Sequence, residues 1–293
     1  MKLVILGSAG QVGRELGRIV LPAGWQAAWF DRVDFDIADA AAVRAVLARE
    51  RPDIVINAAA YTAVDRAERE PEAAWAANAV APALIAAACA ERGAALIHLS
   101  TDYVFDGAKT GAYHEDEPVN PLGVYGKSKA AGEQAVRDGL REHVTIRTAW
   151  LYSVHGQNFV KTILRLAAER PSLRVVADQH GTPTSAADIA AALFAVARQI
   201  DGGRGAWGTF HLTGAEPTTW HGFAEAIVAL AAPHTGKSPP VEAIATADYP
   251  TPAQRPANSV LDCSRIGKAY GIFPRPWHEA LPPVIAELFD KSS

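Results

Sequence analysis

A tyrosine and a lysine stand four positions apart, as Tyr125 and Lys129, in the stretch GVYGKSKAAGEQAV at residues 123–136. Side chains at i and i+4 lie on one face of a helix. A phenol ordinarily has a pKa of about 10, and a nearby ammonium lowers that pKa by stabilising the phenolate. Such a phenol can donate a proton to a developing alkoxide. The pair therefore predicts a catalytic acid and the group that tunes it; the alternative is an ordinary surface pair.

A third polar group is needed to polarise a carbonyl. The stretch HLSTDYVF at residues 98–105 ends a predicted strand, and ligands of open α/β sheets bind at the carboxyl ends of the strands. Thr101 is the best candidate, with Ser100 beside it. We therefore predict a catalytic set of Thr101, Tyr125 and Lys129.

Three glycines, Gly7, Gly10 and Gly13, follow the first predicted strand and open the first predicted helix. Glycines allow a tight turn and a close approach of the backbone, and a helix N-terminus offers free N–H groups to a pyrophosphate. Asp31 follows the second predicted strand, where a carboxylate can accept hydrogen bonds from an adenosine ribose. The pattern predicts a dinucleotide site; the alternative is a plain strand, turn and helix with a surface aspartate.

These residues need a scaffold of alternating strands and helices. The short apolar runs at 2–7, 25–30, 53–60, 95–101 and 143–150 are typical of buried strands, and the segments 11–24, 39–51, 72–93 and 128–139 of helices. Strands that alternate with helices pair in parallel through crossovers. Residues 1–150 therefore predict an α/β fold, a Rossmann-like, doubly wound parallel sheet that forms an NAD(P)-binding domain.

The pattern changes after Trp150. We expect helices at 158–171 and 218–233, a strand, turn and helix over 173–200, a strand at 208–214, and mostly loop over 233–260. Residues 151–293 are therefore predicted to form a smaller, interleaved C-terminal lobe that binds substrate, with returns to the main sheet near 172–215. The proline-rich stretch 248–260 should form part of the wall of the cleft.

The composition excludes several classes of protein. Of 293 residues, 49% are hydrophobic and 20% charged, which is typical of a globular protein. The net charge of −4 favours neither nucleic acid nor an anionic membrane as a partner. The longest apolar stretch, 79–90, contains a proline and is too short to span a bilayer. Two cysteines do not suggest a disulfide framework, so we expect a cytoplasmic protein.

The glycine spacing and the later Tyr-x-x-x-Lys together resemble the extended short-chain dehydrogenase/reductase superfamily. The resemblance narrows to the dTDP-4-dehydrorhamnose reductases on segments that run in order over most of the chain: GQVGRELGR, RPDIVINAAAYTAVDRAE, STDYVFDG, PLGVYGKSKAAGE, RTAWLYS, NFVKTILRLA, DQHGTPT, FHLTG and YPTPAQRPANSVLD. The resemblance implies a reaction in which NADPH or NADH reduces the 4-keto group of dTDP-4-dehydro-L-rhamnose to give dTDP-L-rhamnose.

The resemblance also implies residue roles. For the cofactor, Gly10, Gln11 and Val12 would line the pyrophosphate, and Asp36 and Ile37 would meet the adenine. Ala59, Ala60 and Tyr61 would flank the cofactor, and Lys129 would hold the nicotinamide ribose. The residues implied for the substrate are Thr101, Asp102, Tyr103, Trp150, Asn158 and Arg255. For Trp150 the alternative is core packing, and for Arg255 it is a solvated loop side chain.

A metal site is doubtful. The resemblance implies a homodimer with Mg²⁺ held by glutamates, and Glu15 and Glu287 match two of those positions. Ala187 stands at the third, and the neighbouring Asp188 would point elsewhere on a helix. We therefore predict no metal ligands, and a homodimer stays open.

Two other functions are kept as alternatives. A nucleotide-sugar epimerase or dehydratase would share the superfamily, but the run Thr101-Asp102-Tyr103 lacks the glutamate that follows the aspartate in dehydratases. A regulatory subunit like the β subunit of methionine adenosyltransferase would bind the cofactor without catalysis. The intact Thr101, Tyr125 and Lys129 argue against it.

Overall fold

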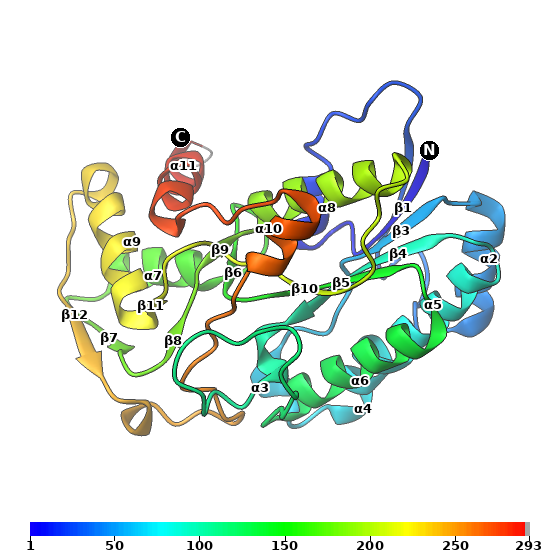
Figure 1. The fold of residues 1–293 in the computed structure, drawn as a ribbon. Helices are drawn as coiled ribbons and strands as arrows, with labels where there is room; N and C mark the ends of the chain where they lie inside the picture. Colours follow the sequence, from blue (N-terminus) through cyan, green and yellow to red (C-terminus); the bar gives the residue numbers. More distant parts are fainter. Residues whose placement is uncertain (291–293) are drawn as a thin grey trace.

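The computed structural model describes residues 1–290 and contains a central sheet of six parallel strands (Figure 1). The strands are β1 (Lys2–Leu6), β2 (Gln26–Phe30), β3 (Ile54–Asn57), β4 (Ala95–Thr101), β5 (His143–Thr148) and β10 (Gly208–His211). Their order across the sheet is β2-β1-β3-β4-β5-β10. The direction of winding changes between β1 and β3, and a doubly wound sheet binds its ligand at such a point.

Helices cover both faces of this sheet (Figure 1). One hydrophobic cluster packs the sheet against α1 (Gln11–Leu16), α8 (Ala186–Asp201) and α10 (Ser264–Tyr270). The other packs it against α2 (Ala40–Glu50), α5 (Ala81–Ala90) and α6 (Val124–Gly139). Strands buried on both faces are uniformly apolar, which is why β1 and β3 lack an alternating pattern. The predicted Rossmann-like α/β class is confirmed.

Two helix boundaries differ from those predicted. Helix α1 ends at Leu16 rather than continuing to residue 24, because glycine at position 17 and the proline and glycine that follow favour turns over helix. Helix α6 begins at Val124, four residues earlier than predicted. That earlier start places Tyr125 within the first turn of the helix and on the same face as Lys129.

The predicted long helix is a composite of α4 (Pro71–Trp75), a π-helical turn (Ala76–Val80) and α5. Taken as one helix, Pro71–Ala90 is long and apolar enough to be a candidate membrane span by length and composition alone, although half of it is buried in the protein. Its buried side chains pack on the sheet and on α6, so it has the character of a core helix. The π-helical turn carries Asn78, whose side chain bonds both backbone groups of Tyr61 and the Ser128 hydroxyl.

A third hydrophobic cluster lies beside the sheet and holds the remaining large helices (Figure 1). It contains α7 (Phe159–Glu169), α9 (Trp220–Thr235), α11 (Trp277–Asp290) and the parallel pair β7 (Leu173–Val176) and β12 (Val241–Ile244). Residues 233–260 are mostly loop, as predicted, but they also contain β12, which was not predicted. The division of the chain at residue 150 stays a prediction: α8 and β10 lie on the main sheet, whereas β7 pairs away from it.

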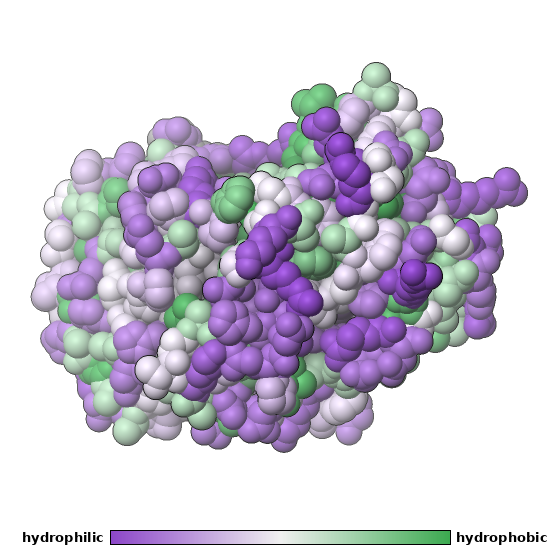
Figure 2. All heavy atoms as spheres, viewed as in Figure 1, coloured by the Kyte–Doolittle hydropathy of each residue, from purple (hydrophilic) through white to green (hydrophobic). Residues whose placement is uncertain are grey.

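The described chain also contains several short elements. They are α3 (Val64–Ala67) and the pairs β6 (Leu151–Tyr152) with β9 (Thr184–Ser185) and β8 (His180–Gly181) with β11 (Thr218–Thr219). On the face seen in Figure 2, hydrophobic side chains are scattered among polar ones and do not gather into one continuous patch.

Candidate active site

A cavity of about 440 Å³ lies at the carboxyl ends of the central strands. Its lining comes from the loops after β1, β3, β4 and β5, from the start of α6 and from the beginning of α9. The lining residues are Gly10, Gln11, Val12, Ala58, Ala60, Thr62, Val64, Leu99, Ser100, Thr101, Asp102, Tyr103, Tyr125, Lys129, Thr148, Ala149, Trp150, Leu151, Gln157, Asn158 and Trp220. All three predicted catalytic residues therefore meet in one cavity.

Lys129 is almost wholly buried, with 2% of its surface exposed. Its Nζ donates a 2.6 Å hydrogen bond to the carbonyl oxygen of Leu99, on β4. Burial lowers the pKa of Lys129 to about 8, and the negative charge of Glu133, one helical turn further along α6, opposes that fall. The ammonium is thus held between the helix and the strand that carries Thr101.

The phenol of Tyr125 does not have the lowered pKa that we expected. Burial raises the pKa of Tyr125 to about 12, opposed by the hydroxyl of Thr101, while Asp102 raises it further. Desolvation penalises the charged phenolate, and burial is the largest cause of this rise in the pKa. The phenol is consequently protonated at neutral pH, which is the form that can donate a proton.

Thr101 and Asp102 form a buried pair at the end of β4. The Thr101 hydroxyl donates to a carboxylate oxygen of Asp102 at 2.9 Å and accepts from the backbone N–H of Tyr103 at 3.2 Å. Burial raises the pKa of Asp102 to about 6, against hydrogen bonds from Ser259 and Thr101 that lower it. The Tyr103 ring meets that of Tyr125 edge to face, so the predicted substrate residues adjoin the predicted acid.

The glycine loop lies against the loop after β3. Gly7 has a φ of +86°, and a Cβ there would come within 2.6 Å of the backbone nitrogen of Ala59. A Cβ on Gly13 would overlap the Gly7 carbonyl and Ser8. The two glycines therefore let the loop pack closely against the backbone after β3 and against the start of α1, and a side chain at either position would displace that backbone. The backbone shape fits a bound pyrophosphate, whose close approach requires such glycines.

The residues predicted to meet the adenosine lie outside the cavity lining but near the glycine loop. The backbone N–H groups of Gly7 and Ser8 both donate to the carbonyl of Phe30, so Asp31 follows directly beside the loop. The Asp31 carboxylate accepts from the backbone N–H of Val33 at 2.8 Å, and Arg32 is exposed. Further along the same loop, Asp36 is exposed, with its carboxylate accepting from a backbone N–H, and Ile37 is half-buried.

Two further predicted residues lie outside the described cavity lining and bond to other side chains. The Tyr61 hydroxyl donates to Glu70 at 2.7 Å and accepts from Arg66, and its side chain is not part of the described lining. Arg255 forms a 2.8 Å ion pair with Asp65 and lies over the ring of Tyr103. The stretch 248–260 is not part of the described cavity lining, so its role as a wall of the cleft stays a prediction.

Residues that follow β5 form another side of the cavity. Trp150 lines it, and the side-chain amide of Asn158 donates to Gln11 at 3.0 Å, joining this side to the glycine loop. Gln157 and Trp220 also line this cavity but were not predicted from the sequence. Trp220 opens α9, and an aromatic residue at the start of an apolar helix is more often part of the core. No pattern in the sequence singled it out.

The residues implied for Mg²⁺ do not fit a metal. Glu15 accepts from the Ser153 hydroxyl at 2.6 Å, and Arg18 bridges it to Glu287, with distances of 3.4 and 3.1 Å. Asp188 forms a 2.9 Å ion pair with Arg275. Within residues 1–290 no group of three or more histidine, cysteine or acidic side chains could hold a metal ion.

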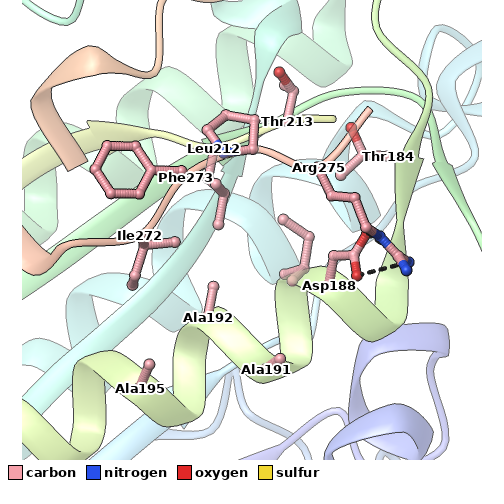
Figure 3. A pocket seen from close by; sticks show the side chains of 12 residues that line it. Thr184, Asp188, Ala191, Ala192, Ala195, Leu212, Thr213, Ile272, Phe273 and Arg275 are labelled. Carbon is pink, nitrogen blue, oxygen red and sulfur yellow. Dashed lines mark hydrogen bonds and ion pairs between the residues drawn. The ribbon is translucent and has the colours of Figure 1, made fainter. Parts of the chain in front are cut away.

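The Asp188 pair closes one end of a second cavity, of about 270 Å³, between α8 and residues 272–275. Figure 3 shows small alanine side chains of α8 along one side and Phe273 on the other. None of the predicted catalytic residues is in its described lining. The chemistry therefore belongs to the larger cavity.

A family model described as the RmlD substrate binding domain matches residues 1–289. The chain belongs to the RmlD family. Members similar to it include a curated dTDP-4-dehydrorhamnose reductase from Aggregatibacter actinomycetemcomitans, 43% identical over 97% of this chain and 98% of the relative. A dTDP-4-dehydrorhamnose reductase structure from Clostridium acetobutylicum has a TM-score of 0.92 and 38% identity, covering 98% of this chain and 99% of that one.

A second RmlD-type structure bears on the cofactor. The dTDP-4-dehydrorhamnose reductase from Bacillus anthracis, solved in complex with NADP, has a TM-score of 0.89 and 34% identity and covers 98% of this chain and 99% of its own. The resemblance derived from the motifs is thus confirmed. A UDP-glucose 4-epimerase from Thermus thermophilus has a TM-score of 0.82 at 20% identity, a likeness that shows the fold alone.

Proposed function

We propose that this chain reduces the 4-keto group of dTDP-4-dehydro-L-rhamnose with NADPH or NADH to give dTDP-L-rhamnose. The observation that carries the proposal is the convergence of Thr101, Tyr125 and Lys129 in one cavity beside the glycine loop. The names and the near full-length similarity of the relatives support the substrate class. A bound nicotinamide supplies the hydride; the protein must supply a proton and hold the reactants.

Each catalytic side chain has a task that follows from its surroundings. The protonated phenol of Tyr125 donates its proton to the oxygen of the carbonyl as negative charge develops on it. Thr101 donates a hydrogen bond to the same oxygen once it exchanges its partner Asp102. The buried ammonium of Lys129 stabilises the phenolate that remains, because an opposite charge in a desolvated site favours the ionised form.

The cofactor is assigned to the crevice between β1 and β3. Gly7 and Gly13 let the loop backbone pack tightly against its neighbours, and Gly10, Gln11 and Val12, which line the cavity, would face the pyrophosphate. Ala59 and Ala60 would flank the cofactor, as would the backbone of Tyr61, which Asn78 fixes through two hydrogen bonds. We assign the substrate to the side formed by Asp102, Tyr103, Trp150 and Asn158. Arg255 would reach its diphosphate only by leaving Asp65.

The two alternatives make different predictions in a direct assay. Loss of the absorbance of the reduced nicotinamide on addition of dTDP-4-dehydrorhamnose supports the reductase. An epimerase would keep its NAD bound through purification, and a regulatory subunit would oxidise no NAD(P)H with any dTDP-4-keto sugar. The comparisons favour neither alternative.

We expect the chain to use both NADH and NADPH. The Asp31 carboxylate can bind the 2′-hydroxyl of NADH and repels a 2′-phosphate, whereas the guanidinium of the exposed Arg32 can neutralise that phosphate. The ratio of kcat/KM for the two cofactors at fixed salt should therefore stay below roughly 100-fold, about 2.7 kcal/mol. Arg32→Ala should shift the ratio toward NADH. A larger ratio in the unaltered protein would mean that one of the two residues dominates.

We also expect kcat/KM to fall in alkaline solution as Lys129 loses its proton. The active form is the ammonium and its pKa is lowered to about 8, so the activity should be level below that pH and decline above it. Lys127 lies on the same helix but is exposed, and Lys127→Met should leave the profile unchanged. A profile that stays level up to the ordinary lysine pKa of about 10.4 would contradict this assignment.

We infer a cytoplasmic location. Cys89 is buried and Cys263 half-buried, and both are free thiols, as is usual in a reducing compartment. The dTDP-sugar is the partner that the proposal requires, and neither nucleic acid nor a membrane is needed. Cell fractionation tests the location, and light scattering in solution tests the open question of a homodimer.

A further inference from the structure

Two tryptophans lie face to face on one side of the active-site cavity. The rings of Trp150 and Trp220 are stacked with centroids 3.5 Å apart and planes at 9°, and both residues line the cavity. Trp150 lies two residues after the end of β5 and immediately before β6. Trp220 begins α9, where the hydroxyl of Thr219 caps the helix by accepting from the backbone of Gly222.

The backbone of Trp150 is held in an unusual conformation. Its φ is +46°, in the left-handed region that large side chains seldom adopt. Residues persist there only where the surroundings enforce it. Three neighbours do so: the ring of Trp220, the backbone N–H of Thr184, which donates to the Trp150 carbonyl at 3.1 Å, and Gly181, where an added Cβ would overlap the indole.

The stack also joins the two parts of the molecule. Gly181 on β8 pairs with Thr218 on β11, and Trp220 begins α9 just after β11, so both neighbours of the Trp150 indole come from outside the main sheet. Trp150 comes from the end of β5, which β4 separates from the crevice between β1 and β3. Because the cofactor is assigned to that crevice, the ligand that faces the tryptophan pair is the second reactant.

We propose that Trp220 is a positioning residue that holds the indole of Trp150 as the wall against which the apolar face of a deoxyhexose ring packs. This rests on the proposed function for the identity of the sugar. An aromatic face offers a large, rigid apolar surface for such packing. Trp220 acts on the sugar only by holding Trp150 in place. Removal of the Trp220 ring should therefore weaken sugar binding and leave cofactor binding unchanged.

Two variants test the proposal from different sides. Trp220→Ala removes the supporting ring, and Gly181→Ala pushes on the indole of Trp150 from a residue outside the cavity lining. Both should raise the Kd for dTDP-L-rhamnose, measured by calorimetry, and the KM for the keto sugar by roughly 10-fold. The Kd for NADPH should stay within about twofold of the unaltered value. Trp220→Phe keeps a stacking ring and should restore most of the affinity.

A matched control separates positioning from general loss of structure. Trp75→Ala removes a half-exposed indole outside the described cavity lining and should change neither ligand's affinity. Unchanged sugar binding in Trp220→Ala and Gly181→Ala would overturn the proposal, as would an equal loss of cofactor and sugar affinity. If the unaltered chain binds the sugar nucleotide but does not turn it over, that result would contradict the proposed reductase activity alone. The Kd values of the variants would still test the positioning role of Trp220. Failure to bind any dTDP-sugar would overturn both.

Discussion

Replacing Tyr125 with phenylalanine should lower kcat by about 100-fold or more, the usual contribution of a general acid. The variant removes one oxygen from a buried ring that lines the cavity and leaves the packing of the ring against Tyr103 in place. NADPH should therefore bind with unchanged affinity, because the glycine loop is untouched. Single-turnover oxidation of NADPH with dTDP-4-dehydrorhamnose measures the effect.

Tyr113→Phe is the matched control. Tyr113 is also buried, and its hydroxyl is hydrogen-bonded to Asp106 outside the described cavity lining. Its removal should alter stability without a comparable fall in kcat. Turnover near the unaltered value in Tyr125→Phe would exclude this phenol as the proton donor and would turn attention to Asp102, a buried carboxyl group of the cavity lining whose pKa is raised to about 6.

The fold was predictable where one physical signal dominates. Buried strands such as β1 and β4 are short, apolar and bounded by turn residues, and crossovers between them require parallel pairing. The weaker elements were not predictable in this way. Strand β12 has only partly buried or exposed residues and exists because it pairs with β7. Helix α11 contains two prolines, and its packing against α9 overrides the usual helix-breaking effect.

The site was predictable where chemistry fixes both residue type and spacing. The glycine loop and the Tyr125–Lys129 pair belong to this class, since each works within one local element. Trp220 was not predictable, because its place beside Trp150 depends on a contact between residues 70 positions apart in the sequence. The pKa of Tyr125 was also misjudged: spacing gives the neighbouring charge, but only the folded structure gives the degree of burial.

A buried ion pair joins the catalytic helix α6 to strand β5. Glu133 lies one turn beyond Lys129 on α6 and is fully buried. It accepts hydrogen bonds from Arg147 on β5, the shortest at 2.7 Å, and Arg147 has only 2% of its surface exposed. A further Arg147 nitrogen lies 3.3 Å from Nε2 of His211. Burial lowers the pKa of that imidazole to about 3, so neutral His211 accepts from Arg147 through Nε2 and donates through Nδ1 to the carbonyl of Tyr113.

Glu133→Gln should therefore destabilise the protein by about 3–5 kcal/mol, the usual cost of leaving one buried charge without its partner. Urea denaturation in the absence of ligands measures the free energy of unfolding. The double variant Glu133→Gln/Arg147→Met removes both charges and should recover much of the loss, because an apolar side chain no longer needs a counter-ion. Glu169→Gln breaks an exposed pair with Arg165 and should cost about 1 kcal/mol or less. Equal losses in Glu133→Gln and Glu169→Gln would show that the buried pair is no more important to the fold than a surface one.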